Sequence, residues 1–372
     1  MKKIVAILLG GIVFGCSTPD NSTETDSGLE NVNFDRTAML THWADNIILP
    51  GYSDLLSQLE ALEGATNSFI NNPDDAKLSA LRTQWVGAYE TWQKVSMFEI
   101  GPAETRNFRS QMNIYPVDRD LIQSNILTGD SNLALPSNRV AKGFPAVDYM
   151  LFGLAENKQT ILSQYTGTAG APYRAYLSAL VADMKTLSSQ IKQDWENGYR
   201  DTFVSNDGSS ATASVDRFVN DFIYYYEKHL RAGKMGIPAG VFSGDVLLQN
   251  IEGRFHGRIS KQMFLSGLQA TQDFFNGKSY ASQSQGPSLA AYLDALNVVK
   301  DGVDLSAIIN SQINTARSEV QGIDTFVGAL QQDPPVAFLE AYDEVQRVVP
   351  LMKVDMVSAL SITIDFVDAD GD

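Results

Sequence analysis

The sequence is poor in the residues that build disulfides and metal sites. It has one cysteine, Cys16, and three histidines among 372 residues. A single thiol excludes a disulfide within the chain and a zinc site made of cysteines. His42, His229 and His256 lie far apart, and no H-E-x-x-H spacing occurs. Each histidine is therefore expected to be a packed or surface residue rather than a metal ligand.

Clusters of lysine and arginine are also absent, and the net charge is −16. Nucleic-acid backbones are bound by clustered basic side chains, so nucleic acid is not an expected partner. Strand patterns are scarce: only Ser361 to Val367 alternates in β fashion, which predicts at most one short strand. No Gly-x-Ser-x-Gly turn follows a strand, so a serine-hydrolase triad has no support.

Long apolar runs are missing except near the start of the chain. Lys2 and Lys3 precede an apolar run over residues 4–14, which is shorter than the roughly 20 residues of a membrane-spanning helix. The run ends in Val13-Phe14-Gly15-Cys16, which is typical of a lipobox. We expect residues 1–15 to be a lipoprotein signal peptide and Cys16 to carry the lipid. The alternative is an ordinary signal peptide in which the cysteine is incidental.

This interpretation of the first residues predicts a location. Residues 16–33 are rich in Ser, Thr, Asp and Glu and are expected to form a flexible tether. The lipid on Cys16 would then make the membrane a partner and anchor the protein in the cell envelope. Ser17, not aspartate, follows the cysteine, which favours the outer membrane, on its periplasmic face or at the cell surface.

Helical periodicity is the feature that the sequence has in abundance. Apolar residues recur every three or four positions in four stretches, and each stretch is the stripe of an amphipathic helix. The stripes are Tyr52, Leu55, Leu59, Leu62; Leu78, Leu81, Trp85, Ala88, Trp92, Val95; Tyr173, Leu177, Leu180, Met184, Leu187, Ile191; and Val215, Phe218, Phe222, Tyr226. Pro73-Asp74-Asp75 and Gly286-Pro287-Ser288 are typical helix starts, and Gly236-Ile237-Pro238 is typical of a helix end.

The predicted fold class is all-α, because several long helices joined by short links pack as bundles. We expect two packed helical bundles, one over residues 34–156 and the other over residues 157–372. The segment after Asn72-Pro73 weakly resembles the segment after Asp333-Pro334-Pro335. That likeness leaves an internal duplication open.

Two carboxylates fall on apolar stripes, where a charge is costly. Glu99 lies seven residues after Trp92, and Asp148 lies four residues after Phe144 and three before Leu151. Burying an ionised carboxylate is unfavourable unless a cation or a hydrogen-bond donor meets it. Both positions are therefore candidates for a site.

A third candidate is Asp118, which fits a helix N-cap equally well. One interpretation is that Asp148, Glu99 and Asp118 converge on a pocket that binds a metal ion or a polar ligand. The other is that they face solvent at helix ends or form structural ion pairs. The arginines available for such pairs are Arg106, Arg109 and Arg119.

The segment Gly143-Phe144-Pro145-Ala146-Val147-Asp148 and its continuation to Gly153 resemble a known signature. The imelysin-like family, also classed as metallopeptidases, carries Gly-x-His-x-x-Glu in this context. The likeness runs from about residue 35 to the end, and Leu351 to Met356 is similar to Bacteroidetes-type members. Further agreement lies in Trp85 to Pro102, Tyr115-Pro116-Val117-Asp118, Lys234-Met235-Gly236-Ile237-Pro238 and Gly286-Pro287-Ser288-Leu289.

The resemblance implies a two-part, all-helical fold with the signature near the interface of the halves. It also implies a place in the bacterial envelope linked to iron uptake, with iron as the metal and envelope iron- or haem-uptake proteins as partners. The chain departs from the signature at two positions. The family's histidine is Pro145, which has no ligand atom, and its glutamate is the shorter Asp148.

Three functions stay open at this point. The first is a non-enzymatic envelope lipoprotein that binds a ligand or partner in iron- or haem-linked uptake, with iron(III) held by Asp148, Glu99, Asp118 and water as one form of the site. The second is a metal-dependent peptidase, which needs a metal-activated water and a general base. It would require His229 or His256 beside Asp148, because one carboxylate does not make a zinc site. The third is a surface scaffold with a lost ligand site. No catalytic residue is assigned.

Overall fold

The helices follow the predicted stripes. The structure is a computed structural model that describes residues 34–129 and 131–366. Helix α3 (Asp75–Val95) begins where Asp74 caps it, and the Asp74 carboxylate accepts a hydrogen bond of 2.8 Å from the N–H of Lys77. The stripe residues Leu78, Leu81, Trp85, Ala88, Trp92 and Val95 are all buried. Helices also form over the stripes of α2, α9 and α11, so the all-α prediction is confirmed.

The chain forms a long series of helices with few interruptions. Its first part contains α1 (Arg36–His42), the π-helix η1 (Trp43–Ile48), α2 (Leu49–Asn71), α3, α4 (Pro102–Thr105), α5 (Phe108–Met112), α6 (Arg119–Thr128), the 3-10 helix η2 (Pro136–Ala141), α7 (Gly143–Asp148) and the π-helix η3 (Tyr149–Gly153). The middle contains α8 (Lys158–Gln164), α9 (Ala171–Asp194), η4 (Trp195–Tyr199), α10 (Arg200–Ser205), α11 (Ser214–Tyr224), η5 (Tyr225–Gly236) and η6 (Leu248–Asn250). The last part contains α12 (Ser260–Phe275), α13 (Leu289–Ala295), α14 (Leu305–Gly322), α15 (Phe326–Leu330), α16 (Val336–Gln346), α17 (Val348–Pro350), η7 (Leu351–Met356) and α18 (Val357–Ala359).

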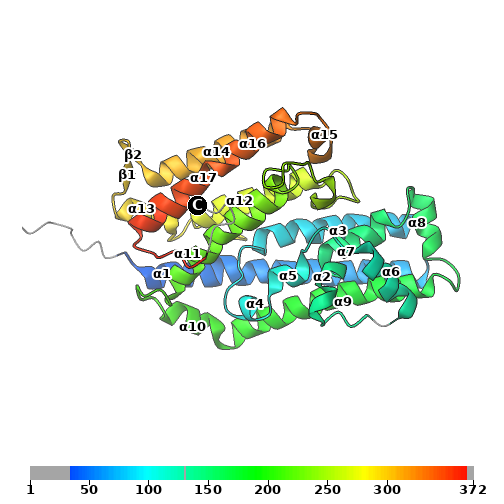
Figure 1. Cartoon of the computed structure of the whole chain (residues 1–372). Helices are drawn as coiled ribbons and strands as arrows, with labels where there is room; N and C mark the ends of the chain where they lie inside the picture. The colour runs from blue at the N-terminus through cyan, green and yellow to red at the C-terminus, as the bar shows by residue number, and fades with distance from the viewer. Residues whose placement is uncertain (1–33, 130, 367–372) are drawn as a thin grey trace, which may run out of the picture. The chain divides into compact units, whose positions relative to one another are not determined.

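The helices pack in two groups that meet along one contact. Helix α2 packs on α3 and α9, and these three form the lower group in Figure 1. Helix α14 packs on α12 and α16, which form the upper group. The contact between α12 and α3 joins the groups, and the buried apolar residues of both belong to one core.

The two predicted halves are linked by direct packing. Helix α9 follows residue 156 but packs on α2 and α7, which precede it. The helices from residue 34 onward form one compact unit. Contacts therefore cross the boundary predicted at 156, and that division stays a prediction. Within the described residues, no helix is long and apolar enough to cross a membrane. The predicted signal peptide, Cys16 and the tether lie outside the described residues.

Residues 361–366, where at most one short strand was expected, form no strand. Two backbone groups of this segment form hydrogen bonds with a side chain instead. The Asn220 amide donates to the carbonyl of Thr363 and accepts from the N–H of Asp365, each at 3.0 Å. A short antiparallel hairpin, β1 (Val299–Lys300) with β2 (Val303–Asp304), occurs at a place where no strand was predicted.

Candidate functional site

The signature segment forms α7, and its first residue has to be glycine. Gly143 has a φ of +74°, and a Cβ there would collide with the carbonyl of Met112. Pro145 lies in the first turn of α7, where a backbone N–H has no partner within the helix. Proline is therefore tolerated at this position without loss of a helical hydrogen bond.

Asp148 ends α7 and is engaged by backbone donors. Its side chain is 2% exposed. One carboxylate oxygen accepts from the N–H of Phe255 at 2.9 Å, and the other accepts from the N–H of His256 at 3.0 Å. Burial raises the pKa of Asp148 to about 7, and the two N–H groups only partly oppose this rise. The carboxylate therefore holds the loop after Glu252 against α7.

A cavity of about 250 Å³, which we call the signature cavity, opens beside Asp148. Pro145 and Asp148 line it from α7, and Tyr115 and Arg119 line it from the segment before α6 and from the helix start. Arg254 belongs to the opposite wall. The signature thus faces a cavity, with one carboxylate and two arginines at its walls.

A buried polar cluster lies behind this cavity. Glu252 is 1% exposed, and Lys234 of η5 forms an ion pair with it. Glu252 also accepts from the Tyr89 hydroxyl at 3.0 Å, the Gln93 amide at 3.2 Å and the Asn113 amide at 2.8 Å. Burial lowers the pKa of Lys234, and the charge of Glu252 opposes that change. The cluster ties α3, η5 and the loop at 252 together.

A second cavity, of about 270 Å³, has three cationic side chains in a mixed polar and apolar lining. We call it the cationic cavity. Its polar walls come from Arg109, Lys228, Lys234, His229, Tyr115 and Tyr225. The hydroxyl of Tyr225 is buried, and the side chain of Ser96 lies within its hydrogen-bonding reach. Burial, with Arg109 and Lys234 nearby, lowers the pKa of His229 well below its usual value, so its ring is neutral.

Lys228 is a cation of this cavity whose ammonium forms an ion pair but no hydrogen bond within the described residues. Its ammonium lies 3.1 Å from the Glu227 carboxylate. The Glu227 carboxylate is also met by Lys353 at 2.9 Å and by Arg231 at 3.8 Å. Three cations thus share one acid.

The cationic cavity adjoins its neighbours through shared walls. Tyr115 also lines the signature cavity, and Arg109 and His229 also line a third cavity of about 420 Å³. This third space, the acid cavity, contains Glu99 and Asp221. The three cavities are therefore neighbours that share wall residues.

Glu99 is held by an arginine, as one of the two interpretations proposed. Arg109 lies 3.3 Å from the Glu99 carboxylate and 3.1 Å from that of Asp221, and the guanidinium is almost fully buried. Burial raises the pKa of Glu99 to about 7 and that of Asp221 to about 6, against the opposing charge of Arg109. Glu99 is therefore a partner in an ion-pair network.

Asp118 caps a helix. It is the N-cap of α6, and its carboxylate accepts from the N–H of Leu121 at 2.9 Å. Asp148, Glu99 and Asp118 thus lie in three separate environments. Across residues 34–129 and 131–366, no group of three or more His, Cys, Asp or Glu side chains is placed to hold a metal ion. Metal or ligand binding by the single acids stays a prediction.

The histidines are packed against other residues. His256 packs against Phe152, with ring centroids 4.9 Å apart, and its backbone N–H binds Asp148. His42 contacts the carbonyl of Gly277 through Nε2 at 2.8 Å. Sequence reasoning missed Glu252, and it noted Lys234 only within a longer similar stretch.

Comparisons with known proteins identify the family. The family model for imelysin matches residues 48–348. The chain belongs to the imelysin family. An imelysin-like protein from Psychrobacter arcticum 273-4 has a TM-score of 0.68 at 18% identity, covering 89% of this chain and 97% of that one. A protein described as a putative iron-regulated protein A precursor, from Parabacteroides distasonis, has a TM-score of 0.66 at 17% identity, covering 86% and 95%.

A relative with a more limited match is iron-regulated protein A of Synechococcus elongatus. It is 27% identical over 114 residues, which are 31% of each chain, so the chain spans about a third of that relative's length. Within the imelysin family, the resemblance places a histidine where this chain has Pro145 and a glutamate where it has Asp148. Both positions line the signature cavity.

Proposed function

We propose that the protein is a non-catalytic, envelope-anchored member of the imelysin family that binds a small anionic ligand in iron- or haem-linked uptake. The names of two relatives support the link to iron: iron-regulated protein A of Synechococcus elongatus, and the protein from Parabacteroides distasonis described as a putative iron-regulated protein A precursor. A precursor also fits an exported protein. The lipobox ending in Cys16 supports a lipid anchor, with the outer membrane as the proposed site.

The observation that carries this proposal is the lining of the cationic cavity. Arg109, Lys228 and Lys234 line a space of about 270 Å³, and each also pairs with a carboxylate. The hydroxyl of Tyr225 and the neutral ring of His229 add groups that can form hydrogen bonds with a ligand in the cavity. Carboxylate and phosphate oxygens are the natural partners of such donors. Iron chelates of small carboxylates, such as ferric citrate, belong to this ligand class.

The residues at the signature favour binding over peptide cleavage. Pro145 offers no ligand atom, and both oxygens of Asp148 already accept backbone N–H groups. A metallopeptidase needs protein ligands for a metal and a general base for the attacking water. The ring of His256, the nearest histidine, packs against Trp85 and Phe152.

Calorimetry on the purified full chain tests the proposal. Citrate, ferric citrate, phosphate, iron(II), zinc and haem are titrated into the wild type and into Lys228→Gln, Tyr225→Phe and Asp148→Ala. We expect a carboxylate or phosphate ligand to bind, and Lys228→Gln to weaken it by about tenfold or more. Arg139→Gln, which removes a positive charge outside these cavities, is the matched control.

Other results would favour the alternatives. Binding of a metal salt that Asp148→Ala abolishes and Lys228→Gln leaves intact would place the ligand at the signature. Chelator-sensitive cleavage of a protein substrate such as casein would support the peptidase. A folded protein that binds none of the probes would leave the scaffold role.

A further inference from the structure

A larger pocket lies on the other side of α3, between this helix, α12 and α14. Its volume is about 700 Å³, and it shares no lining residue with the signature, cationic or acid cavity. Pockets that enclose organic molecules of moderate size have volumes of about 300 to 1,000 Å³. The α12 pocket, as we call it, therefore has room for an organic ligand.

Four cations of the α12 pocket have no carboxylate partner. Lys94, Arg258, Lys261 and Arg317 line the pocket, and none forms an ion pair within the described part of the chain. Arg317 donates only to amide oxygens, those of Gln272 at 2.6 Å and Asn314 at 2.7 Å. Lys261 donates to a backbone carbonyl, that of Ile323. These charges are available to a ligand.

The two acids of the α12 pocket, by contrast, are already met by donors. Glu90 accepts from the Gln262 amide at 3.0 Å and from the Ser266 hydroxyl at 3.3 Å. Asp273 accepts from Gln269 at 2.8 Å, and Lys278 lies 3.4 Å from it. The pocket thus has an excess of positive charge within a chain whose net charge is −16. An anion is the ligand that this excess favours.

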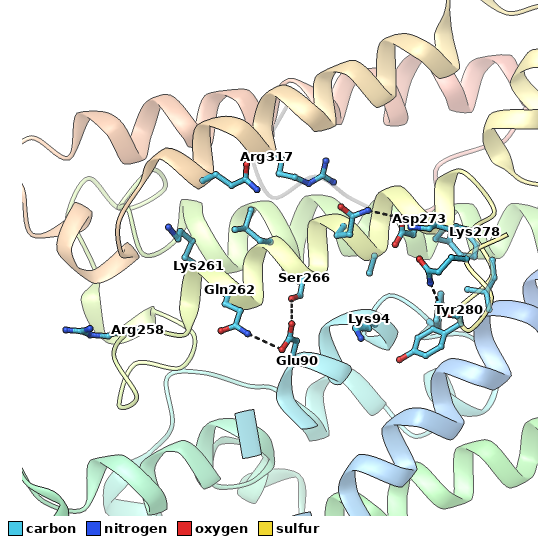
Figure 2. A pocket seen from close by; sticks show the side chains of 18 residues that line it. Glu90, Lys94, Arg258, Lys261, Gln262, Ser266, Asp273, Lys278, Tyr280 and Arg317 are labelled. Atoms are coloured by element: carbon cyan, nitrogen blue, oxygen red, sulfur yellow. Dashed lines mark hydrogen bonds and ion pairs between the residues drawn. The ribbon is translucent and has the colours of Figure 1, made fainter. Parts of the chain in front are cut away.

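Three of the four cations lie toward the two ends of the pocket, and Arg317 lies between them on the α14 side, as Figure 2 shows. Arg258 and Lys261 lie near the start of α12, and Lys94 lies toward the other end, near Tyr280. The helix rise of 1.5 Å per residue puts the length of α12 from Lys261 to Asp273 at about 18 Å. The apolar part of the lining is Ile47, Phe98, Leu265, Ala270 and Phe274.

We propose that the α12 pocket binds an elongated organic dianion with an apolar body and a carboxylate at each end. One carboxylate meets Arg258 and Lys261, and the other meets Lys94, while the body lies on the apolar wall. A small anion such as phosphate reaches only one end, and a neutral chain leaves the cations unpaired. This site is separate from the cationic cavity and goes beyond the proposed function.

The test is calorimetry on the purified full chain with three probes of equal length: dodecanedioate, dodecanoate and dodecanediol. Dodecanedioate is expected to bind at least about tenfold more tightly than dodecanoate, and dodecanediol is expected not to bind. Lys261→Gln and Lys94→Gln should each bring dodecanedioate close to the affinity of dodecanoate. Arg139→Gln makes the same change in net charge outside the pocket and should have no effect.

Three results would overturn the proposal. Equal affinity of the folded wild type for the diol and the dianion would make the pocket merely apolar. A loss of dodecanedioate affinity in Arg139→Gln as large as that in Lys261→Gln would reduce the effect to overall charge. Finally, absence of dodecanedioate binding at millimolar concentration would show that the pocket does not recognise this class.

Discussion

Replacing Glu252 by glutamine should destabilise the protein more than any change at its surface. Glu252 is the centre of the buried polar cluster, where it forms an ion pair with Lys234 and accepts from three neutral donors. Glutamine keeps the shape but removes the charge. The ammonium of Lys234, whose side chain is 4% exposed, would keep only the Gln93 carbonyl oxygen at 2.8 Å.

The magnitude follows from the burial of both partners. Breaking a buried ion pair by removing one charge costs about 3 to 5 kcal/mol, because the other charge stays buried without a counterion. We therefore expect Glu252→Gln to lower the free energy of unfolding by about 4 kcal/mol, a large share of the roughly 5 to 15 kcal/mol of a folded domain. Lys234→Met should lower it by about 3 kcal/mol.

The double variant distinguishes an ion pair from two independent losses. With both charges removed, no buried charge lacks a partner, so the loss should be about 4 kcal/mol rather than the sum of about 7. Urea unfolding at neutral pH measures all three variants. Glu63→Gln, at the part-exposed pair with Lys185, is the control and should cost less than about 1 kcal/mol. Additivity of the two single losses within about 0.5 kcal/mol would refute the reasoning.

Three further predictions concern the signature and the acids. Gly143→Ala should cost at least about 3 kcal/mol in urea unfolding, because its φ is +74° and the Cβ would collide with Met112. Asp118→Ala should cost about 1 kcal/mol through the lost N-cap and leave every calorimetric titration unchanged. The native pKa of Asp148, about 7, exceeds its unfolded value of about 3.9, so the native state binds the extra proton and stability falls as pH rises through this window. Relative to Asp148→Asn, the free energy of unfolding of the wild type should fall by about 3 kcal/mol between about pH 5 and about pH 8. Parallel plots of unfolding free energy against pH for the two proteins would contradict the raised pKa.

The helices were predicted well from local sequence patterns, because apolar spacing and capping depend on residues that are close together in the chain. The stripe from Leu78 to Val95 became α3, and Pro73-Asp74-Asp75 became its start. Ser288 caps α13 as expected from Gly286-Pro287-Ser288. The stripe fixes which face of a helix is buried, and the capping residue fixes where it begins.

The site could be predicted only in part, because its contacts join distant segments. Alternation at 361–366 suggested a strand, but Asn220 from another helix satisfies that backbone. The pair of Lys234 with Glu252 has no signature in local spacing. An acid on an apolar stripe indicates that a partner exists, but it does not tell an arginine from a metal ion. Glu99 has Arg109 as that partner.

The partners of the three candidate acids bear on which ligand the protein is expected to bind. Asp148 is engaged by two backbone N–H groups, Glu99 by a guanidinium and Asp118 by a helix end. Each acid therefore stabilises the fold with the oxygens that a cation would need. The cavities on the two sides of α3 are lined by basic side chains, among them Lys228 on one side and Lys261 on the other. Because these groups bind oxyanions, an iron-linked role is better served by binding iron inside an anionic chelate than by binding the bare ion.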